Sequence, residues 1–387
     1  MVLVSRKDEI TILQQMLDSN RPEFLCLYGR RRVGKTFLIR EFFENKKIIF
    51  FNVTGAKDAP MAEQLQHFME ELGKTFYQGA KLQNVKNWND AFNSLTQALA
   101  SSPANKSIVL FFDELPWMAT KRSRLLQNLD YYWNQHWSRD KRIKLIVCGS
   151  SASWILHKIV RNKGGLYNRM TREIHLEPLN LPETKNFLDQ MGIQLNHQQV
   201  LLLYMVTGGI PYYFIKAEKG LTAMQIIEKL AFSKNGFFLK EFDNLFSSLF
   251  DDNDAYIDIV RKIGKFRYGV GQQELLNLFG KHAQGGAYIR KLKNLEETGF
   301  IMSYVPLFHK EKGIYYRVTD EYVLFYLKWI EPLRKNLQKA ALSRGNWQVM
   351  QNTAEWNNWL GYAFENICYK HLSAIRKALN ISPTAMA

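Results

Sequence analysis

Short apolar runs alternate with longer segments of helical periodicity over the first half of the chain. In the helical segments, apolar residues recur at every third or fourth position, as at Leu65, Phe68, Met69 and Leu72, which is typical of amphipathic helices. The apolar runs are too short for helices and predict buried strands at residues 24–28, 47–53, 107–112, 144–148 and 172–176. This alternation favours an α/β fold with a doubly wound, five-stranded parallel sheet over residues 1–178.

The remaining residues predict three further parts. Residues 179–252 are helical in pattern and indicate a lid domain, interrupted by the sequence Thr-Gly-Gly-Ile-Pro at 207–211, which predicts a sharp turn. Residues 253–332 predict two amphipathic helices and then two alternating strands, at 272–279, 288–297, 300–304 and 314–318. This order is typical of a helix–turn–helix with a two-stranded wing. Residues 333–387 predict a polar linker followed by a last helix from residue 359.

One stretch directly after the first predicted strand carries a phosphate-binding pattern. Residues 29–36 read Gly-Arg-Arg-Arg-Val-Gly-Lys-Thr and match G-x-x-x-x-G-K-[ST], and a helical pattern follows at once. The glycines let the backbone amides wrap a phosphate, Lys35 supplies a positive charge, and the Thr36 hydroxyl lies where Mg²⁺ would bind. The residues predicted to bind the nucleotide are Gly29, Arg30, Arg31, Arg32, Val33, Gly34, Lys35, Thr36 and Phe37. Arg30, Arg31 and Arg32 could bind phosphate, contact a partner or contact DNA.

The third predicted strand ends in two carboxylates. Residues 107–114 read Ser-Ile-Val-Leu-Phe-Phe-Asp-Glu, and ligands of open parallel sheets bind at the carboxyl ends of the strands. We expect Asp113 to hold Mg²⁺ together with Thr36, and Glu114 to polarise an attacking water. A strand that merely ends in an acidic turn is the alternative, and the preceding phosphate-binding loop argues against it.

Two further residues are candidate catalytic groups, each with an open alternative. Ser150, or the neighbouring Ser151, follows the fourth predicted strand and could hydrogen-bond the terminal phosphate or the attacking water. A serine-rich helix cap is the alternative. Arg169 is a candidate charge-stabilising arginine, acting within the chain or across a subunit contact. A solvated surface arginine is the competing interpretation.

The formal net charge of +16 indicates an anionic partner beyond a nucleotide, with nucleic acid first and a membrane surface second. Residues 261–350 hold 16 Lys and Arg but 7 Asp and Glu, so more than half of the excess charge lies in this quarter of the chain. This distribution favours contact with duplex DNA. The candidate residues are Arg290, Lys291, Lys293, Lys310 and Lys312. A winged helix that only packs against its neighbours is the alternative.

The three cysteines, Cys26, Cys148 and Cys368, lie far apart, which argues against a disulfide framework and against a zinc cluster.

No apolar run approaches the ~20 residues that a membrane-spanning helix needs. Charged residues interrupt the apolar start at once, so no signal peptide is expected. A cytoplasmic location is therefore expected.

Taken together, these motifs resemble the archaeal-type ATPases of the STAND branch of P-loop NTPases. The resemblance lies in segments 29–36, 111–117, 148–151, 166–169, 207–211 and 316–320. It implies ATP or ADP as the ligand, with Arg6 and Pro211 near the nucleotide base. It also implies that 361–365 begins a restriction-nuclease-like domain. Since no Asp or Glu follows Glu365, a nuclease metal site cannot form there, and we expect a truncated domain.

Two hypotheses for the function follow. The first is a slow Mg²⁺-dependent ATPase whose nucleotide state controls a winged-helix module that binds DNA. The second is a nucleotide-dependent switch of the STAND type that acts through protein–protein contacts or a homo-oligomer, without DNA. A nucleic-acid-processing enzyme that lacks its nuclease part is the weakest alternative, because the carboxylates are absent.

Overall fold

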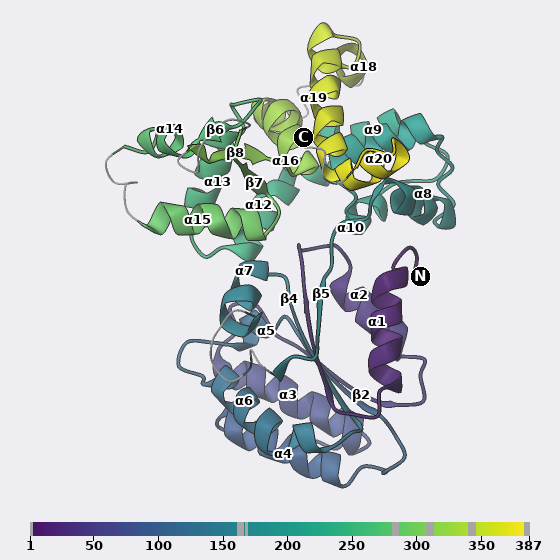
Figure 1. Ribbon diagram of the computed structural model, residues 1–387, viewed down its shortest axis with the longest axis vertical. Coiled ribbons are helices and arrows are strands. Elements are labelled where there is room, and N and C mark those ends of the chain that lie inside the picture. Colours follow the sequence, from purple (N-terminus) through teal and green to yellow (C-terminus); the bar gives the residue numbers. More distant parts are fainter. Residues whose placement is uncertain are drawn as a thin grey trace. The chain divides into compact units, whose positions relative to one another are not determined.

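The computed structural model describes residues 3–160, 166, 169–280, 286–306, 313–339 and 346–382 (Figure 1). The chain divides into two compact units, Met1–Glu177 and Pro178–Ala387, and each is described by itself. None of the helices within the described ranges is long and apolar enough to cross a membrane. The division of the second unit into lid, winged helix and C-terminal region stays a prediction.

The first unit is built on the predicted five-stranded parallel sheet. Its strands are β1 (Glu23–Tyr28), β2 (Ile49–Thr54), β3 (Ile108–Asp113), β4 (Ile143–Gly149) and β5 (Arg172–His175). They lie in the order β2-β3-β4-β1-β5, and every neighbouring pair is parallel. All residues of the three central strands are buried, as expected where helices cover both faces of a parallel sheet. The α/β fold is therefore confirmed.

Helices pack on both faces of this sheet (Figure 1). The helices of the first unit are α1 (Lys7–Asp18), α2 (Lys35–Phe43), α3 (Met61–Phe76), α4 (Trp88–Ala100), α5 (Leu115–Met118), α6 (Leu125–Gln135) and α7 (Ala152–Ile155), with short turns η1 (Trp137–Arg139) and η2 (Leu156–Val160). The core under α3, α4 and α6 is aromatic. Phe68 contacts Phe51, Phe92 and Phe112, with ring centroids 5.2, 5.8 and 6.2 Å away. This cluster fixes β3, which ends in Asp113 and is followed by Glu114, against the helical layer.

The second unit begins with a helical region. Its helices are α8 (Leu181–Gln190), α9 (His197–Thr207), α10 (Pro211–Phe214), α11 (Ala223–Ile227) and α12 (Phe238–Leu249), with a π-helical turn η4 (Glu228–Phe232) after α11. The turn predicted at 207–211 joins α9 to α10. Gly208 and Gly209 both have positive φ angles, of 66° and 73°. A Cβ on Gly209 would lie 2.0 Å from the Leu179 carbonyl oxygen, so only glycine fits at this position.

Three helices and a small antiparallel sheet follow. The elements are α13 (Asn253–Ile263), β6 (Val270–Gly271), α14 (Gln272–Asn277), α15 (Gly286–Glu297), β7 (Ile301–Tyr304) and β8 (Tyr315–Val318). The strands lie in the order β6-β8-β7, and both pairs are antiparallel. Leu292 and Leu295 on α15 are buried. The winged-helix assignment of these elements stays a prediction.

The C-terminal region contains α16 (Glu321–Phe325), η7 (Tyr326–Ile330), η8 (Glu331–Leu333), α17 (Arg334–Gln338), α18 (Asn346–Met350), α19 (Ala354–Lys370) and α20 (Leu372–Ala378). The prediction of a polar linker is wrong at α18. Trp347 is buried there, and its ring stacks on Phe232 at 4.3 Å. The last helix begins five residues before the predicted start and ends at Lys370, so α20 is a separate helix.

Buried polar contacts tie α19 to the rest of the second unit. Asn366 donates to the Thr319 carbonyl oxygen at 2.9 Å and accepts from Arg317 at 3.3 Å. Lys370 pairs with the buried Glu321 at 2.6 Å. The helix that resembles the start of a nuclease-like domain is thus part of the packing of the second unit. The nuclease-like resemblance itself stays a prediction.

Candidate nucleotide-binding site

The predicted phosphate-binding residues gather at one edge of the sheet of the first unit. The parallel register places Tyr28 at the end of β1 beside Gly149 at the end of β4. It also places Phe112, next to Asp113, beside Val147. The loop at 29–34, the Asp-Glu pair and Ser150 therefore all leave the sheet at its carboxyl edge, where parallel sheets bind ligands.

The backbone of the loop depends on its two glycines. Gly29 has a φ of 148°, and a Cβ there would lie 2.3 Å from the Leu176 carbonyl oxygen. Gly34 has a φ of 99° and precedes the first residue of α2. These backbone conformations are open to glycine and unfavourable for other residues. They let the loop fold back over the N-terminus of α2, where backbone N–H groups attract anions.

Replacement of Gly29 by alanine is expected to destabilise the first unit. The added methyl group would clash with the Leu176 carbonyl, so the loop or strand β5 must shift, at a cost of about 1–3 kcal/mol. Thermal unfolding of the G29A protein measures this effect. Gly79→Ala is a suitable control, because Gly79 also has a positive φ but no atom lies within 4 Å of its added Cβ.

Lys35 is buried and held by oxygens. Only 4% of the residue is exposed, and its Nζ donates to the carbonyls of Gly29 and Arg30 at 2.9 and 3.0 Å and to the Ser150 Oγ at 3.0 Å. Burial lowers the pKa of Lys35 below the ordinary lysine value, while the nearby Glu114 and Asp113 carboxylates act in the opposite direction. A buried ammonium group that lacks a full counter-charge is well suited to receive a phosphate.

This environment predicts that nucleotide binding is coupled to proton uptake. A bound phosphate would stabilise the charged form of Lys35 and raise its pKa. At an alkaline pH above the lowered pKa of the free protein, binding must then take up a proton, and the affinity for ATP must fall as the pH rises. Calorimetric titrations in two buffers of different ionisation enthalpy measure this uptake. Binding enthalpies that are the same in both buffers at every alkaline pH would contradict the expectation.

Thr36 and Asp113 form an oxygen pair that fits Mg²⁺. The Thr36 Oγ1 donates to the Asp113 Oδ2 at 2.8 Å, and Asp113 is 2% exposed. The other oxygen of Asp113 accepts from the Glu114 backbone N–H at 3.1 Å. Mg²⁺ prefers such hard oxygen ligands, and it usually binds through one or two protein groups together with phosphate oxygens and waters. The structure thus brings together the two residues predicted to hold the metal.

Glu114 is fixed in place by Ser150. The Ser150 backbone N–H donates to the Glu114 Oε2 at 3.0 Å, and the Ser150 hydroxyl donates to the Glu114 Oε1. Glu114 itself has a positive φ of 48°, which turns the chain sharply after Asp113. The Ser150 side chain does not cap α7, because its hydroxyl donates to Glu114 and accepts a hydrogen bond from Lys35. The N-cap residue of α7 is Ser151, which makes no side-chain cap hydrogen bond. Ser150 links the two groups on which the predicted chemistry depends.

The remaining loop residues surround this network. Arg6 donates to the carbonyls of Val33 and Glu177 at 3.2 and 2.8 Å, and so connects the start of α1 to the phosphate-binding loop. Arg30 is buried, and Arg31 lies over the Trp117 ring at 5.9 Å. The backbone of Arg32 adopts a positive φ of 73°. Val33 is buried, and Phe37 is half-buried on α2.

No described contact joins the other candidate residues to the network of Lys35, Ser150 and Glu114. Arg169 is exposed, in a turn that follows a short segment outside the described residues. Pro211 opens α10 in the second unit. Arg290 and Lys293 are exposed on α15, whereas Lys291 pairs with Asp252. Lys310 and Lys312 lie outside the described residues.

Two residues that were given no role from the sequence support the site. They are Gln64 and Trp117, and the resemblance includes Trp117 only as the end of segment 111–117. Gln64 is 1% exposed and bonds both the N–H and the carbonyl of Ala56 as well as the Trp117 carbonyl. It therefore joins the loop after β2 to the turn after the Asp-Glu pair. Gln64 stands within a helical pattern of apolar residues, and a single polar residue in such a pattern does not indicate a buried contact.

Three comparisons place this site among known proteins. Residues 3–217 match a family described as an ATPase domain predominantly from Archaea. An uncharacterized protein of Methanocaldococcus jannaschii is 29% identical over 381 residues, which cover 97% of this chain and 78% of that protein. The Walker-type ATPase PABY2304 of Pyrococcus abyssi has a similar structure, with a TM-score of 0.55 at 18% identity, over 84% of this chain and 96% of that chain.

The ORC2 protein of Aeropyrum pernix, solved in ADPNP–ADP complexes, is also similar in structure. Its TM-score is 0.53 at 15% identity, over 88% of this chain and 95% of that chain. At these identities the two structures support the P-loop ATPase fold and no finer property. The family match spans more than half of the chain and contains the whole candidate site. The chain therefore belongs to the family of ATPase domains found predominantly in Archaea.

Proposed function

We propose that the protein is a Mg²⁺-dependent ATPase whose nucleotide state controls DNA binding by a winged helix in its second unit. The observation that carries the enzymatic part is the connected network of Lys35, Ser150 and Glu114 beside the Thr36–Asp113 pair. These contacts join, at one edge of the sheet, the residues to which we assign phosphate binding, metal binding and orientation of the attacking water. P-loop ATPases need these groups together for phosphoryl transfer.

Each residue has a defined role in this proposal. The loop amides and Lys35 hold the phosphates, while Thr36 and Asp113 hold the metal. A bound Mg²⁺ would neutralise charge that develops on the phosphate oxygens. Glu114 accepts a hydrogen bond from the attacking water and orients it toward the terminal phosphate. Ser150 fixes the position of the Glu114 carboxylate through both of its donors.

Two arginines and a proline complete the proposed site. Arg6 lies against the phosphate-binding loop, and with Pro211 from the second unit it would border the adenine base. Arg169 would stabilise charge on the transferred phosphoryl group, and its exposed side chain is compatible with a role within the chain or across a subunit contact. Slow turnover is part of the proposal, because a nucleotide-controlled switch requires long-lived bound states.

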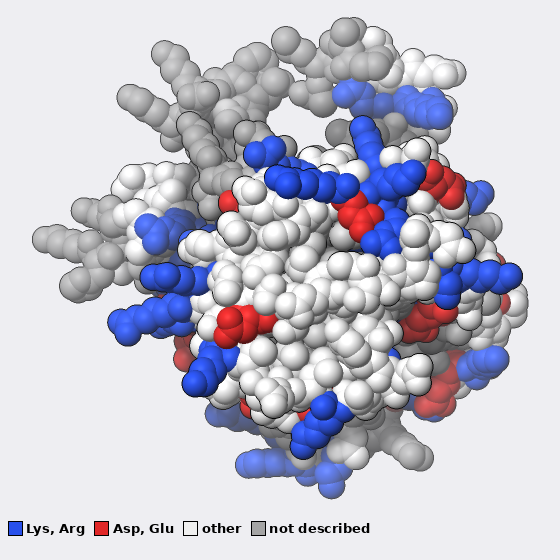
Figure 2. All heavy atoms as spheres, turned by 90° about the horizontal axis from the view of Figure 1, so that it is seen from below, with Lys and Arg blue, Asp and Glu red and all other residues white. Residues whose placement is uncertain are grey.

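The DNA-binding part rests on the second unit. Its α13, β6, α14, α15, β7 and β8 follow the order of a winged helix, with α15 as the recognition helix. Arg290 and Lys293 on α15 are exposed and available for phosphate contacts. The face of the molecule in Figure 2 differs from α15 in its charge: Lys and Arg lie mostly around an uncharged central area, with Asp and Glu among them. The local excess of positive charge in residues 261–350 therefore favours the second unit as the DNA-binding part.

Binding of a fluorescein-labelled duplex, followed by anisotropy over a salt series, tests the DNA-binding proposal. We expect an affinity that falls steeply with salt, and a smaller salt dependence in the Arg290→Ala/Lys293→Ala variant, because two phosphate contacts are lost. Lys57→Ala/Lys86→Ala is the matched control, since it removes two exposed cations from the first unit. If the control and the α15 variant have the same salt dependence, α15 does not contact DNA.

The alternative is a nucleotide-dependent switch of the STAND type that acts through protein–protein contacts. One observation favours it: Lys291 is held by Asp252 and lies 5.3 Å from the centroid of the Tyr256 ring. This contact leaves α15 with fewer cations for DNA than its sequence suggests. Absence of duplex binding in every nucleotide state, together with tightly retained ADP, would support this alternative.

A further inference from the structure

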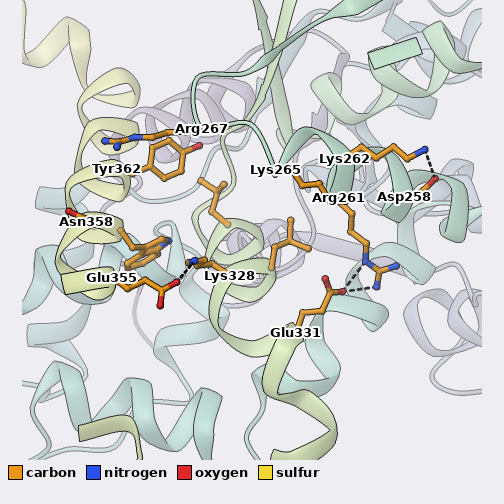
Figure 3. A pocket seen from close by; sticks show the side chains of 14 residues that line it. Asp258, Arg261, Lys262, Lys265, Arg267, Lys328, Glu331, Glu355, Asn358 and Tyr362 are labelled. Carbon is orange, nitrogen blue, oxygen red and sulfur yellow. Dashed lines mark hydrogen bonds and ion pairs between the residues drawn. The ribbon is translucent and has the colours of Figure 1, made fainter. Parts of the chain in front are cut away.

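The second unit contains a pocket that is separate from the proposed ATPase site. Its volume is about 750 Å³, and all of its lining residues lie between Asp258 and Tyr362. The pocket is formed by the C-terminal half of α13 and the turn after it, by the α16–η7 segment and by α19 (Figure 3). Small-molecule sites in proteins commonly have volumes of about 300–1,000 Å³.

The rim of the pocket is positively charged. Five of the lining residues are Lys or Arg, and three are Asp or Glu. Each carboxylate is paired with one cation of the rim: Asp258 with Lys262, Glu331 with Arg261, and Glu355 with Lys328. Lys265 and Arg267 remain, and within the described parts of the chain neither of them has a carboxylate partner. Two cations are thus left to attract an anionic ligand into the pocket.

The walls offer flat apolar surfaces. Tyr362 on α19 and Leu324 and Leu327 on the α16–η7 segment line the pocket. Trp359, one turn before Tyr362, also borders the pocket, but it is only 6% exposed and its ring stacks on Trp356. The Arg267 guanidinium lies 5.7 Å from the centroid of the Tyr362 ring and 5.3 Å from that of the exposed Tyr268 ring. Figure 3 shows the Arg267 side chain alongside the Tyr362 ring. Planar cations and aromatic rings arranged in this way form stacking platforms for nucleobases.

We infer that this pocket binds a nucleotide, with its phosphate at Lys265 and Arg267 and its base against Tyr362. The ligand is either a free mononucleotide or one nucleotide of a single strand, since both present a phosphate next to a flat ring. An acidic peptide fits less well, because a carboxylate carries less charge than a phosphate and has no ring attached to it. The inference does not depend on ATP hydrolysis in the first unit.

The test uses the full chain and a fluorescein-labelled oligothymidylate of about twelve nucleotides. Asn358 is an exposed rim residue on α19, and the neighbouring Asn357 is exposed but does not line the pocket. We expect Asn358→Glu to weaken strand binding at least about tenfold, because a carboxylate would repel the phosphate at the rim. Asn357→Glu changes the net charge equally and is expected to have little effect. Equal loss in both variants would overturn the inference.

A second pair of variants tests Lys265 and Arg267, the two rim cations without a carboxylate partner among the described residues. Lys265→Gln/Arg267→Gln is expected to weaken strand binding at least about tenfold, since it removes two charge-assisted hydrogen bonds. Lys335→Gln/Lys339→Gln is the matched control, because both lysines are exposed in the second unit and lie outside the pocket. Equal effects of these two double variants would likewise overturn the inference. Unchanged strand binding by Arg290→Ala/Lys293→Ala separates this site from the proposed duplex-binding helix.

Competition identifies the source of the ligand. If AMP displaces the labelled strand, the pocket accepts a free mononucleotide. If AMP does not displace the strand while the pocket variants release it, the pocket requires a nucleic-acid strand. If neither AMP nor the strand binds to the second unit in a pocket-dependent way, the inference is wrong.

Discussion

Replacement of Glu114 by glutamine is expected to slow ATP hydrolysis by a factor of about 10²–10⁴, with ATP binding unchanged. The substitution removes the negative charge that would accept a hydrogen bond from the attacking water. It preserves the local structure, because a glutamine oxygen can accept from the Ser150 N–H while its amide donates to the Ser150 hydroxyl. Steady-state turnover and nucleotide titration of the E114Q protein measure the two effects separately.

A matched control for this prediction is Glu173→Gln. Glu173 is a carboxylate on the edge strand β5 that accepts from the Tyr28 hydroxyl, and no contact joins it to Lys35 or Asp113 in the described structure. We expect this variant to hydrolyse ATP at close to the wild-type rate. Wild-type turnover by E114Q would show that Glu114 does not orient the attacking water.

Replacement of Lys35 by alanine is expected to weaken ATP binding by about 30-fold or more and to abolish measurable hydrolysis. Truncation of one partner of a buried, hydrogen-bonded charge pair costs about 2–5 kcal/mol, which corresponds to this change in the dissociation constant. The fold should survive, since burial already disfavours the charged form of Lys35 in the free protein. Titration with a fluorescent ATP analogue measures the affinity, and thermal unfolding checks the fold.

Lys74→Ala is the control for this variant, because Lys74 is an exposed lysine on α3 that pairs only with the neighbouring Glu71 among the described side chains. It should bind and hydrolyse ATP like the wild-type protein. Hydrolysis by the Lys35→Ala protein at the wild-type rate would place the ATPase site elsewhere.

The sequence predicts the centre of the site well because its parts are contiguous. Residues 29–34 form the loop between β1 and α2, and Lys35 and Thr36 open α2. Asp113 ends β3, and Glu114 follows it directly. Parallel strands bring their carboxyl ends to one edge, so two local motifs are enough to place Lys35 and Asp113 close together. The fold of the first unit follows from the same alternation of apolar runs and helices.

The missed features depend on contacts between segments that lie far apart in the chain. Gln64 and Trp117 meet across 53 residues, and nothing in the local pattern of either segment indicates the contact. The pairing of Ser150 with Glu114 spans 36 residues, so the sequence could suggest a role for the serine without naming its partner. Such partners are set by packing of the whole unit.

The linker prediction failed for a related reason. The residues around Trp347 are mostly polar, and a single tryptophan gives no periodic pattern. The structure nevertheless buries Trp347 between Phe232 and Trp356, with ring centroids at 4.3 and 5.0 Å. One large aromatic side chain can thus anchor a polar segment.

We propose that the nucleotide state of the first unit controls DNA binding by the second unit. The most direct measurement compares duplex-DNA affinity of the E114Q protein saturated with ATP and Mg²⁺ with that of the same protein saturated with ADP. If nucleotide and DNA binding are coupled, the two dissociation constants are expected to differ by about 5–150-fold, the usual range for coupled sites. Equal duplex affinities in the two nucleotide states would contradict the proposal, even if ATP is hydrolysed by the wild-type protein.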